Sequence, residues 1–310
     1  MNKNRTILQI SLWAMIVAPI VISIVLLFGQ RLAGQFMAWQ ENRRLRAVGA
    51  DAHHVNPPAQ SDTFAGKLSP TWAFKIINGA GQIGNGLEFH NTSLSLEHGL
   101  TISQRFDPDF GQESASNQQP ASQRYNNATL IGFQGYQPIP GEDVLVQARM
   151  QVSPDFYGSA GLVLQPQGTI LEDGSFQGRF HNQAFTLFGI CFIGSESNLF
   201  GKSGTTVERV VNWWPEEVQG LDVDMHEPHT YLLRLHWVDD QTWQGITSVD
   251  GQVVSSMTLP PLGPLEVQLW SDNYALKTSF SGTPVIGFQN GASKWVRFEE
   301  VSARAEAAQP

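Results

Sequence analysis

The stretch HTYLLRLHWVDDQTWQGITSVDGQVVSSMTL, residues 229–259, decides the fold class. Its first part alternates with the two-residue period of a β-strand, and one face collects Tyr231, Leu233, Leu235 and Trp237. Asp250-Gly251 then separates ITSV from QVVSSMTL, and Asp-Gly between two apolar runs is typical of a two-residue hairpin. The stretch therefore predicts consecutive antiparallel strands.

The same alternation continues on both sides of this stretch. It recurs in EDVLVQARMQV (142–152) and in PLEVQLWSDN (264–273), and no sustained helical period or fixed repeat follows residue 50. Twenty-nine glycines and 17 prolines supply the turns that many short strands need. We expect an all-β domain over residues 62–305, with an exposed loop at 111–124 and a short tail at 306–310.

The charge distribution separates the first 50 residues from the rest. The net charge is −9, yet residues 1–50 hold six basic residues and one acidic residue, and the other 260 hold 13 basic and 27 acidic. An acidic domain repels nucleic acid, so nucleic-acid binding is excluded as a general function. The single cysteine, Cys191, excludes an internal disulfide and lies in an apolar run typical of a buried thiol.

The N-terminal region has the pattern of a membrane anchor. After a short polar N-terminus (1–6), the residues from Ile7 to Phe28 are uncharged, which is about the length that crosses a bilayer. The span is longer than the apolar core of a signal peptide, and the sequence that follows it, GQRLAG, is not a convincing cleavage site. We therefore predict an uncleaved transmembrane helix at 7–29. A juxtamembrane stalk (30–48) and an Ala- and Pro-rich linker (49–61) follow.

The orientation of this helix is set by opposing signals. Basic residues flank both ends, and their count favours a cytoplasmic C-terminal side. The domain that follows favours the outside, as argued below. We expect a single-pass membrane protein with an extracytoplasmic domain, and the membrane is its first expected partner.

Four blocks of the domain resemble the laminarinase and lichenase glycoside hydrolases of the concanavalin A-like superfamily. They are SDTFAGKLSPTWAF (61–74), FYGSAGLVLQP (156–166), PHTYLLRLHW (228–237) followed by a VDG hairpin, and KWVRFEEVSAR (294–304). The resemblance covers nearly all of residues 62–305. It implies a jelly-roll sandwich of two curved antiparallel sheets, of which the concave sheet forms a carbohydrate-binding groove.

The catalytic carboxylates of those enzymes have no counterpart on the corresponding strand. The resembling hydrolases hold a nucleophile and an acid on one strand as E-x-D-x-E or E-x-D-x-x-E, whereas AFTLFGICFIG (184–194) contains no carboxylate. A similar D-x-D-x-x-E occurs as Asp222, Asp224 and Glu227, but it lies in a loop directly before His229. We predict no catalytic residue, and a displaced acid set is the enzyme alternative.

No cofactor or metal site is expected. His226 and His229 lie near the acidic loop without the spacing of a metal site. Asp107, Asp109 and Glu113 offer the oxygen ligands that calcium prefers, but too few of them, so calcium is an unsupported possibility. No P-loop, G-x-S-x-G or H-E-x-x-H pattern is present.

Sugar sites combine an aromatic face with amide and carboxylate groups that bind hydroxyls. The best such set surrounds one tryptophan and consists of Trp270, Gln268, Glu266, Asp272 and Asn273. A second aromatic pair is Trp213 and Trp214. The alternative is that these tryptophans fill the core of the sandwich.

Two classes of function remain after the enzyme alternative. One is a membrane-anchored, non-catalytic, lectin-like module that binds extracellular or cell-surface glycan. The other is a structural subunit that uses the sandwich for protein contacts within a membrane assembly. The missing carboxylates favour both over hydrolysis, and the sequence alone does not separate the two.

Overall fold

A computed structural model describes residues 51–78, 83–85, 94–104, 126–154, 156, 158–167, 169–170, 176–177, 188–197, 205–214, 217–272 and 294–308. These residues belong to one compact unit, Val48–Pro310, and nearly all of their regular structure is β-strand. The predicted membrane helix at 7–29, the stalk at 30–48 and the loop at 111–124 lie outside the described residues. Within the described part of the chain, no helix is long and apolar enough to span a bilayer.

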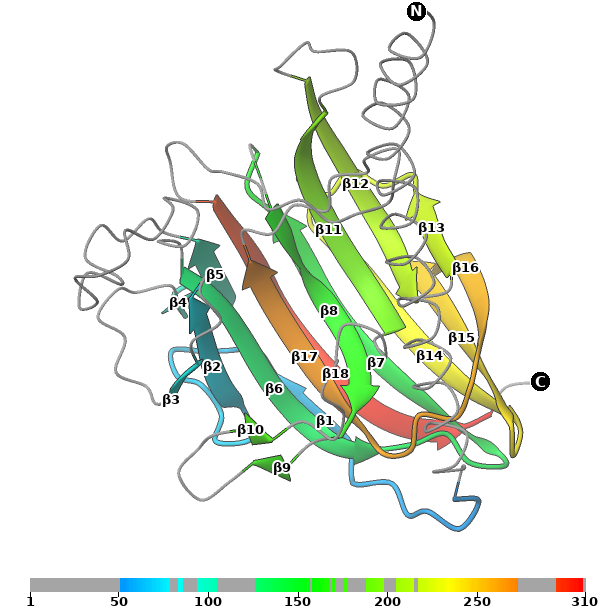
Figure 1. Ribbon diagram of the computed structural model, residues 1–310. Helices are drawn as coiled ribbons and strands as arrows, with labels where there is room; N and C mark the ends of the chain where they lie inside the picture. Colours follow the sequence, from blue (N-terminus) through cyan, green and yellow to red (C-terminus); the bar gives the residue numbers. More distant parts are fainter. Residues whose placement is uncertain are drawn as a thin grey trace, which may run out of the picture. The chain divides into compact units, whose positions relative to one another are not determined.

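One sheet, called sheet A, is built mainly from the second half of the chain (Figure 1). Its strands lie in the order β16 (Gln252–Leu259), β15 (Thr242–Val249), β14 (His229–Asp239), β7 (Glu142–Val152), β18 (Lys294–Ala307), β5 (Leu100–Gln104) and β4 (Leu94–Ser95). The short strand β1 (Gln60–Asp62) also pairs with β18. The long closing strand β18 thus joins the two ends of the domain.

The second sheet, called sheet B, contains the segments that the sequence marked for function. Its order is β13 (Glu217–Leu221), β12 (Thr205–Trp214), β11 (Phe188–Ser197), β8 (Gly158–Pro166), β17 (Leu265–Asp272), β6 (Asn126–Tyr136), β2 (Ala73–Asn78) and β3 (Ile83–Asn85). A separate two-stranded sheet consists of β9 (Thr169–Ile170) and β10 (Phe176–Gln177). The pairings between these strands are antiparallel, as the sequence predicted.

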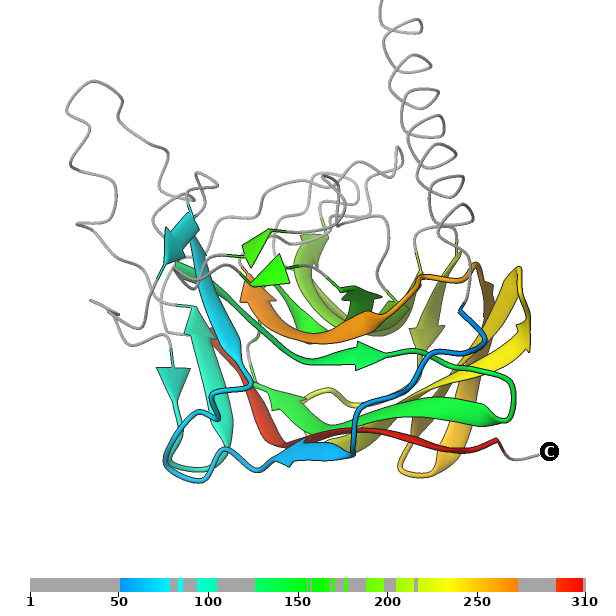
Figure 2. The ribbon, with the colours of Figure 1, turned by 90° about the horizontal axis from the view of Figure 1, so that it is seen from below.

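The two large sheets stack as the layers of a sandwich (Figure 2). The strand β17 bends so that its ends turn away from sheet A, which makes the outer face of sheet B concave (Figure 2). The core between the layers is apolar and aromatic, and its largest fully buried side chains include Trp243, Tyr231, Phe188, Phe192 and Phe298. The prediction of an all-β, jelly-roll-like sandwich of two antiparallel sheets is confirmed.

The hairpin predicted from Asp250-Gly251 joins β15 to β16. Both turn residues have positive φ, 48° and 81°, which defines the type I′ turn that this dipeptide favours. The Asp250 carboxylate also accepts hydrogen bonds from Thr230 N (2.9 Å) and His229 Nδ1 (2.6 Å). These bonds, the one to Thr230 first, lower the pKa of Asp250 below its usual value. The turn is therefore fixed to the start of β14.

One glycine allows the two layers to approach closely. A Cβ atom on Gly245 of β15 would lie 2.7 Å from Cζ of Phe188, which belongs to β11 of the opposite sheet. Real Cβ atoms do not approach so closely, so the Phe188 ring occupies the space that a side chain at 245 would need. This contact fixes Phe188 on the inner face of sheet B.

The residues just before the first strand pack on the sandwich, although their composition is that of a linker. His54 Nε2 donates to Gly135 O (2.6 Å), Asn56 Nδ2 donates to Glu142 Oε2 (3.2 Å), and Tyr136 Oη donates to Pro58 O (2.7 Å). At the other end, β18 continues through Ala307, which pairs with Glu142. The sandwich thus extends beyond 62–305 at both ends.

Candidate functional site

The candidate site lies on the outer, concave face of sheet B. The strand register aligns Trp270 of β17 with Gly161 of β8, and Gly161 with Cys191 of β11. In the next row, Gln268 is aligned with Val163, and Val163 with Gly189. Aligned residues of neighbouring strands share a face of the sheet, so these side chains form adjoining parts of one surface.

Trp270 lies over a glycine at the centre of this surface. A Cβ atom on Gly161 would collide with the Ile190 carbonyl oxygen and lie 2.8 Å from Cη2 of Trp270. The ring therefore covers Gly161 and packs against Cys191 and Ile193 of β11. Its Nε1 atom donates to Ser159 Oγ at 3.4 Å, and the side chain remains partly exposed. Trp270 is a fixed aromatic surface element, outside the core between the sheets.

Glu266 lies on the same strand but is fully buried. Its two carboxylate oxygens accept hydrogen bonds from Gln165 Nε2 (2.5 Å) and Gln134 Nε2 (2.8 Å). Gln165 is on β8 and Gln134 on β6, so this cluster ties β17 to both neighbours. The other amide atom of Gln165, Oε1, is buried without a hydrogen-bond partner. The carboxylate is held by amides rather than offered to solvent.

The other predicted ligand residues are placed only by their backbone, or not at all. Asp272 pairs with Ser159, so it lies one row beyond Trp270 on β17. Trp213 pairs with Gly189, in the row of Gln268, and Trp214 pairs with Glu217 of the edge strand β13. Asn273 lies outside the described residues. The structure therefore brings Trp270, Gln268 and Glu266 onto one strand and places Trp213 on the same sheet, two strands beyond β8.

The stretch that the sequence resemblance matches to the catalytic strand of glycoside hydrolases, residues 184–194, lies in part on β11 (Phe188–Ser197). Phe188, Ile190 and Phe192 are fully buried toward sheet A, so the intervening residues, Gly189 and Cys191, face outward. Neither is a carboxylate, as the sequence predicted for this stretch. Among the described side chains of the concave face, Glu266 is the one carboxylate.

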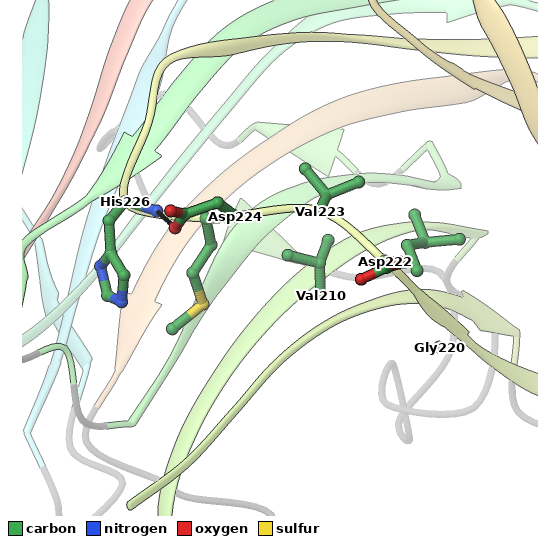
Figure 3. A pocket seen from close by; sticks show the side chains of 8 residues that line it. Val210, Gly220, Asp222, Val223, Asp224 and His226 are labelled. Atoms are coloured by element: carbon green, nitrogen blue, oxygen red, sulfur yellow. Dashed lines mark hydrogen bonds between the residues drawn. The ribbon is translucent and has the colours of Figure 1, made fainter.

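The acidic loop lies apart from this surface. Asp222 and Asp224 line a pocket of about 520 Å³ together with Val210, Gly220, Leu221, Val223, Met225 and His226 (Figure 3). Asp224 Oδ1 accepts a hydrogen bond from the backbone N–H of His226 in the same loop (3.0 Å). Glu227 is not among the described residues that line the pocket. Burial, followed by the charges of Asp250 and Asp224, raises the pKa of the neighbouring Tyr231. The three acids do not form one convergent set.

Metal ligands do not converge in the described part of the domain. No group of three or more His, Cys, Asp or Glu side chains there could hold a metal ion. His226 Nδ1 donates to Ser153 O (3.0 Å) and His229 donates to Asp250, so each has a structural partner. The calcium possibility at Asp107, Asp109 and Glu113 lies outside the described residues.

Several residues of the site carried no clear signal in the sequence. Gln134 reaches Glu266 because β6 has an irregular register there, with Phe133 at a φ of 48°. Ser159 reaches Trp270 across 111 residues of chain. Gly161 had a usable signal, since a glycine inside a strand pattern indicates close approach of another group.

The chain is similar to several solved structures at low sequence identity. No model of a known protein family matches the sequence, and no curated protein matches it. Among solved structures, a β-glucanase of Bacillus licheniformis is 14% identical, covers 80% of this chain and 99% of its own, and has a TM-score of 0.42. The κ-carrageenase of Pseudoalteromonas carrageenovora is 13% identical over 82% and 96%, with a TM-score of 0.44.

A third similar structure, the carbohydrate recognition domain of Emp47p, is 11% identical over 82% of this chain and 98% of its own, with a TM-score of 0.37.

Proposed function

We propose that the concave face of sheet B binds glycan and that Trp270 stacks on a sugar ring. The observation that supports this proposal is the placement of Trp270, whose ring is held over Gly161 and against β11 while part of it stays exposed. An aromatic ring fixed in advance loses little conformational freedom when a ligand stacks on it. Gln268, in the adjoining row, adds an amide that both donates and accepts hydrogen bonds to hydroxyls.

The proposed module binds without cleaving. Retaining hydrolysis needs two carboxyl groups about 5 to 5.5 Å apart, and inverting hydrolysis needs two at about 6.5 to 9.5 Å. Glu266 has no second carboxylate beside it among the described side chains of this face, and its own oxygens are occupied by two amides. A buried carboxylate held in this way stabilises the strands rather than attacking a sugar.

The proposal includes a membrane anchor at 7–29 and a domain outside the membrane. The uncharged residues from Ile7 to Phe28 support the anchor. A glycan-binding face is useful where glycans are displayed, which supports the extracytoplasmic side. The resulting protein is a single-pass, lectin-like module for extracellular or cell-surface glycan.

The test is glycan binding by the full chain in detergent, first on a glycan array and then by titration of the best ligand. Changing Trp270→Ala removes a stacking face that contributes about 1 kcal/mol or more, so we expect a loss of at least roughly fivefold in affinity. Trp270→Phe keeps a smaller ring and should retain part of the affinity.

Trp295→Ala is the matched control, because Trp295 is a partly exposed tryptophan of sheet A that packs under Arg297 (4.8 Å). Equal losses in the two alanine variants, or no glycan ligand at all, would contradict the proposal. Release of reducing ends from a bound glycan would show that the module is an enzyme instead.

A further inference from the structure

The edge of sheet A at β16 is uncharged and, among the described residues, longer than the other edge strands of the two large sheets. The strands β15 and β16 contain no charged residue, although charged residues make up 15% of the chain. In the described part of the domain, no strand pairs with the outer side of β16. Every second residue of such a strand directs its N–H and C=O groups away from the sheet, where they can pair with another strand.

The other three edges of the two large sheets, among the described residues, are blunted in ordinary ways. The strands β4 and β3 are two and three residues long, and β13 is five residues long and begins with Glu217. Natural proteins protect sheet edges with short strands and charged side chains, and β16 has neither over its eight residues. Its one irregularity is a register shift next to Val254, at the hairpin end.

The exposed side chains of β16 are also suited to a partner. Val253 is 68% exposed, and Ser256 and Thr258 are exposed further along the strand. The alternate residues, Ser255, Met257 and Leu259, are buried in the sandwich. A strand added beside β16 would therefore extend both faces of sheet A without opening the core.

We propose that β16 pairs with β16 of a second copy of this chain, antiparallel and about a two-fold axis, so that sheet A continues across a dimer. A two-fold axis brings a residue close to the same residue of the second copy when that residue lies near the axis. A charged side chain there would therefore face a like charge. The chain carries a net charge of −9, so two copies repel each other on average. The uncharged border formed by β15 and β16 is where they can approach.

The position of the axis follows from the pattern of faces. Two residues that lie opposite each other in paired strands must point to the same face of the sheet, so their numbers must differ by an even number. The two-fold axis therefore passes through the position of one residue, which lies opposite its own copy. Ser256 is the exposed residue nearest the middle of Gln252–Leu259, and an axis there pairs the inward-facing Ser255 with Met257 of the second copy. Opposed residues in antiparallel strands have Cα atoms about 4.5 to 5.5 Å apart, within the range that a disulfide spans.

The test uses the full chain in detergent with two substitutions at one position. Ser256→Cys should form an intermolecular disulfide under mild oxidation, visible as a dimer on a non-reducing gel. Ser95→Cys is the matched control, because Ser95 is an exposed serine on β4 at the opposite edge of the same sheet. Cys191 is buried, so the unsubstituted chain should not cross-link.

The second substitution, Ser256→Lys, puts like charges together at the axis. The native chain should have twice the monomer mass by light scattering corrected for detergent, and Ser256→Lys should have the monomer mass while keeping the far-UV circular dichroism spectrum of the native fold. Ser95→Lys should remain a dimer.

Three results would overturn the proposal. They are a monomeric native chain, equal cross-linking of the two cysteine variants, or a dimer that Ser256→Lys leaves intact. The last result would assign the contact to another part of the chain. The Trp270-dependent binding of glycan is measured separately, so the proposed function can hold when this proposal fails.

Discussion

The contact between Gly245 and Phe188 offers a test of the strand register on which the non-catalytic proposal depends. If Phe188 points into the core, the outward positions of β11 are Gly189 and Cys191, and neither supplies a carboxylate. Gly245→Ala would place a methyl group 2.7 to 2.9 Å from Phe188 Cζ, Phe188 Cε2 and Leu259 Cδ1. Each of these atoms belongs to a side chain, so the cost is overpacking rather than a backbone collision.

The magnitude follows from two opposing effects. Overpacking a dense core costs about 1 to 3 kcal/mol, and replacing glycine by alanine recovers about 0.4 to 1 kcal/mol from the unfolded chain. The difference leaves a net loss between about 0 and about 2.6 kcal/mol. Its middle value of about 1.3 kcal/mol lowers the midpoint of a domain of this size by about 3 to 5 °C. Phe188→Leu alone should cost about 1 kcal/mol through a poorly filled core.

The two changes together should cost less than their sum. Phe188→Leu removes the ring atoms that the new methyl group meets, so we expect a favourable coupling of about 1 kcal/mol. The assay is urea unfolding of the fragment Val48–Pro310, the compact unit of the chain, for the native sequence, both single variants and the double variant. Strictly additive costs would refute the contact, and with it the inward position of Phe188.

Three further predictions concern the turn, the buried carboxylate and the orientation. Asp250→Asn keeps the type I′ turn but removes the charged hydrogen-bond acceptor. Because the pKa of Asp250 in the folded chain is below the usual 3.8, the native chain should have the higher thermal midpoint above about pH 5. This difference in midpoint, measured by circular dichroism, should disappear as the pH falls through the folded pKa of Asp250. Glu266→Gln places an amide against the N–H donors of Gln134 and Gln165, so the free energy of unfolding should fall by about 1 to 3 kcal/mol. As a control, Glu299→Gln removes an exposed ion pair with Arg149 and should change the free energy of unfolding by less than about 1 kcal/mol. Protease added to intact cells should remove the domain. Digestion only after lysis of a cell with one membrane, or only after rupture of the inner membrane of a cell with a periplasm, would assign the domain to the cytoplasmic side.

The sequence predicted the parts of the fold that depend on neighbours along the chain. The alternation in Leu265–Trp270 is visible because one face of β17 is buried and the other lines the outer surface. The turn at Asp250-Gly251 is visible because few dipeptides adopt two positive φ angles. Both signals are local, and both predictions are confirmed.

Features that depend on distant partners were not predictable in the same way. Glu266 has the sequence context of a sugar ligand, but its burial depends on Gln134 and Gln165, which are more than 100 residues away. Asp143 has the alternation of an outer-face residue, yet it is buried with His236 Nδ1 donating to it at 2.7 Å. The pattern of one strand specifies a face, whereas coverage of that face is decided by other strands.

The bonded segment before β1 has a mechanical consequence. A free chain of the twelve residues from Asp51 to Asp62 could extend by up to about 40 Å, at roughly 3.3 to 3.6 Å per residue. Here that length is fastened to the sandwich at His54, Asn56 and Pro58, and then at β1. If sheet B binds a ligand as proposed, tension between that ligand and the N-terminal end of the chain would load these bonds and the β1–β18 pair directly. The domain would then transmit the force, because the segment from Asp51 to Asp62 could not extend until these bonds break.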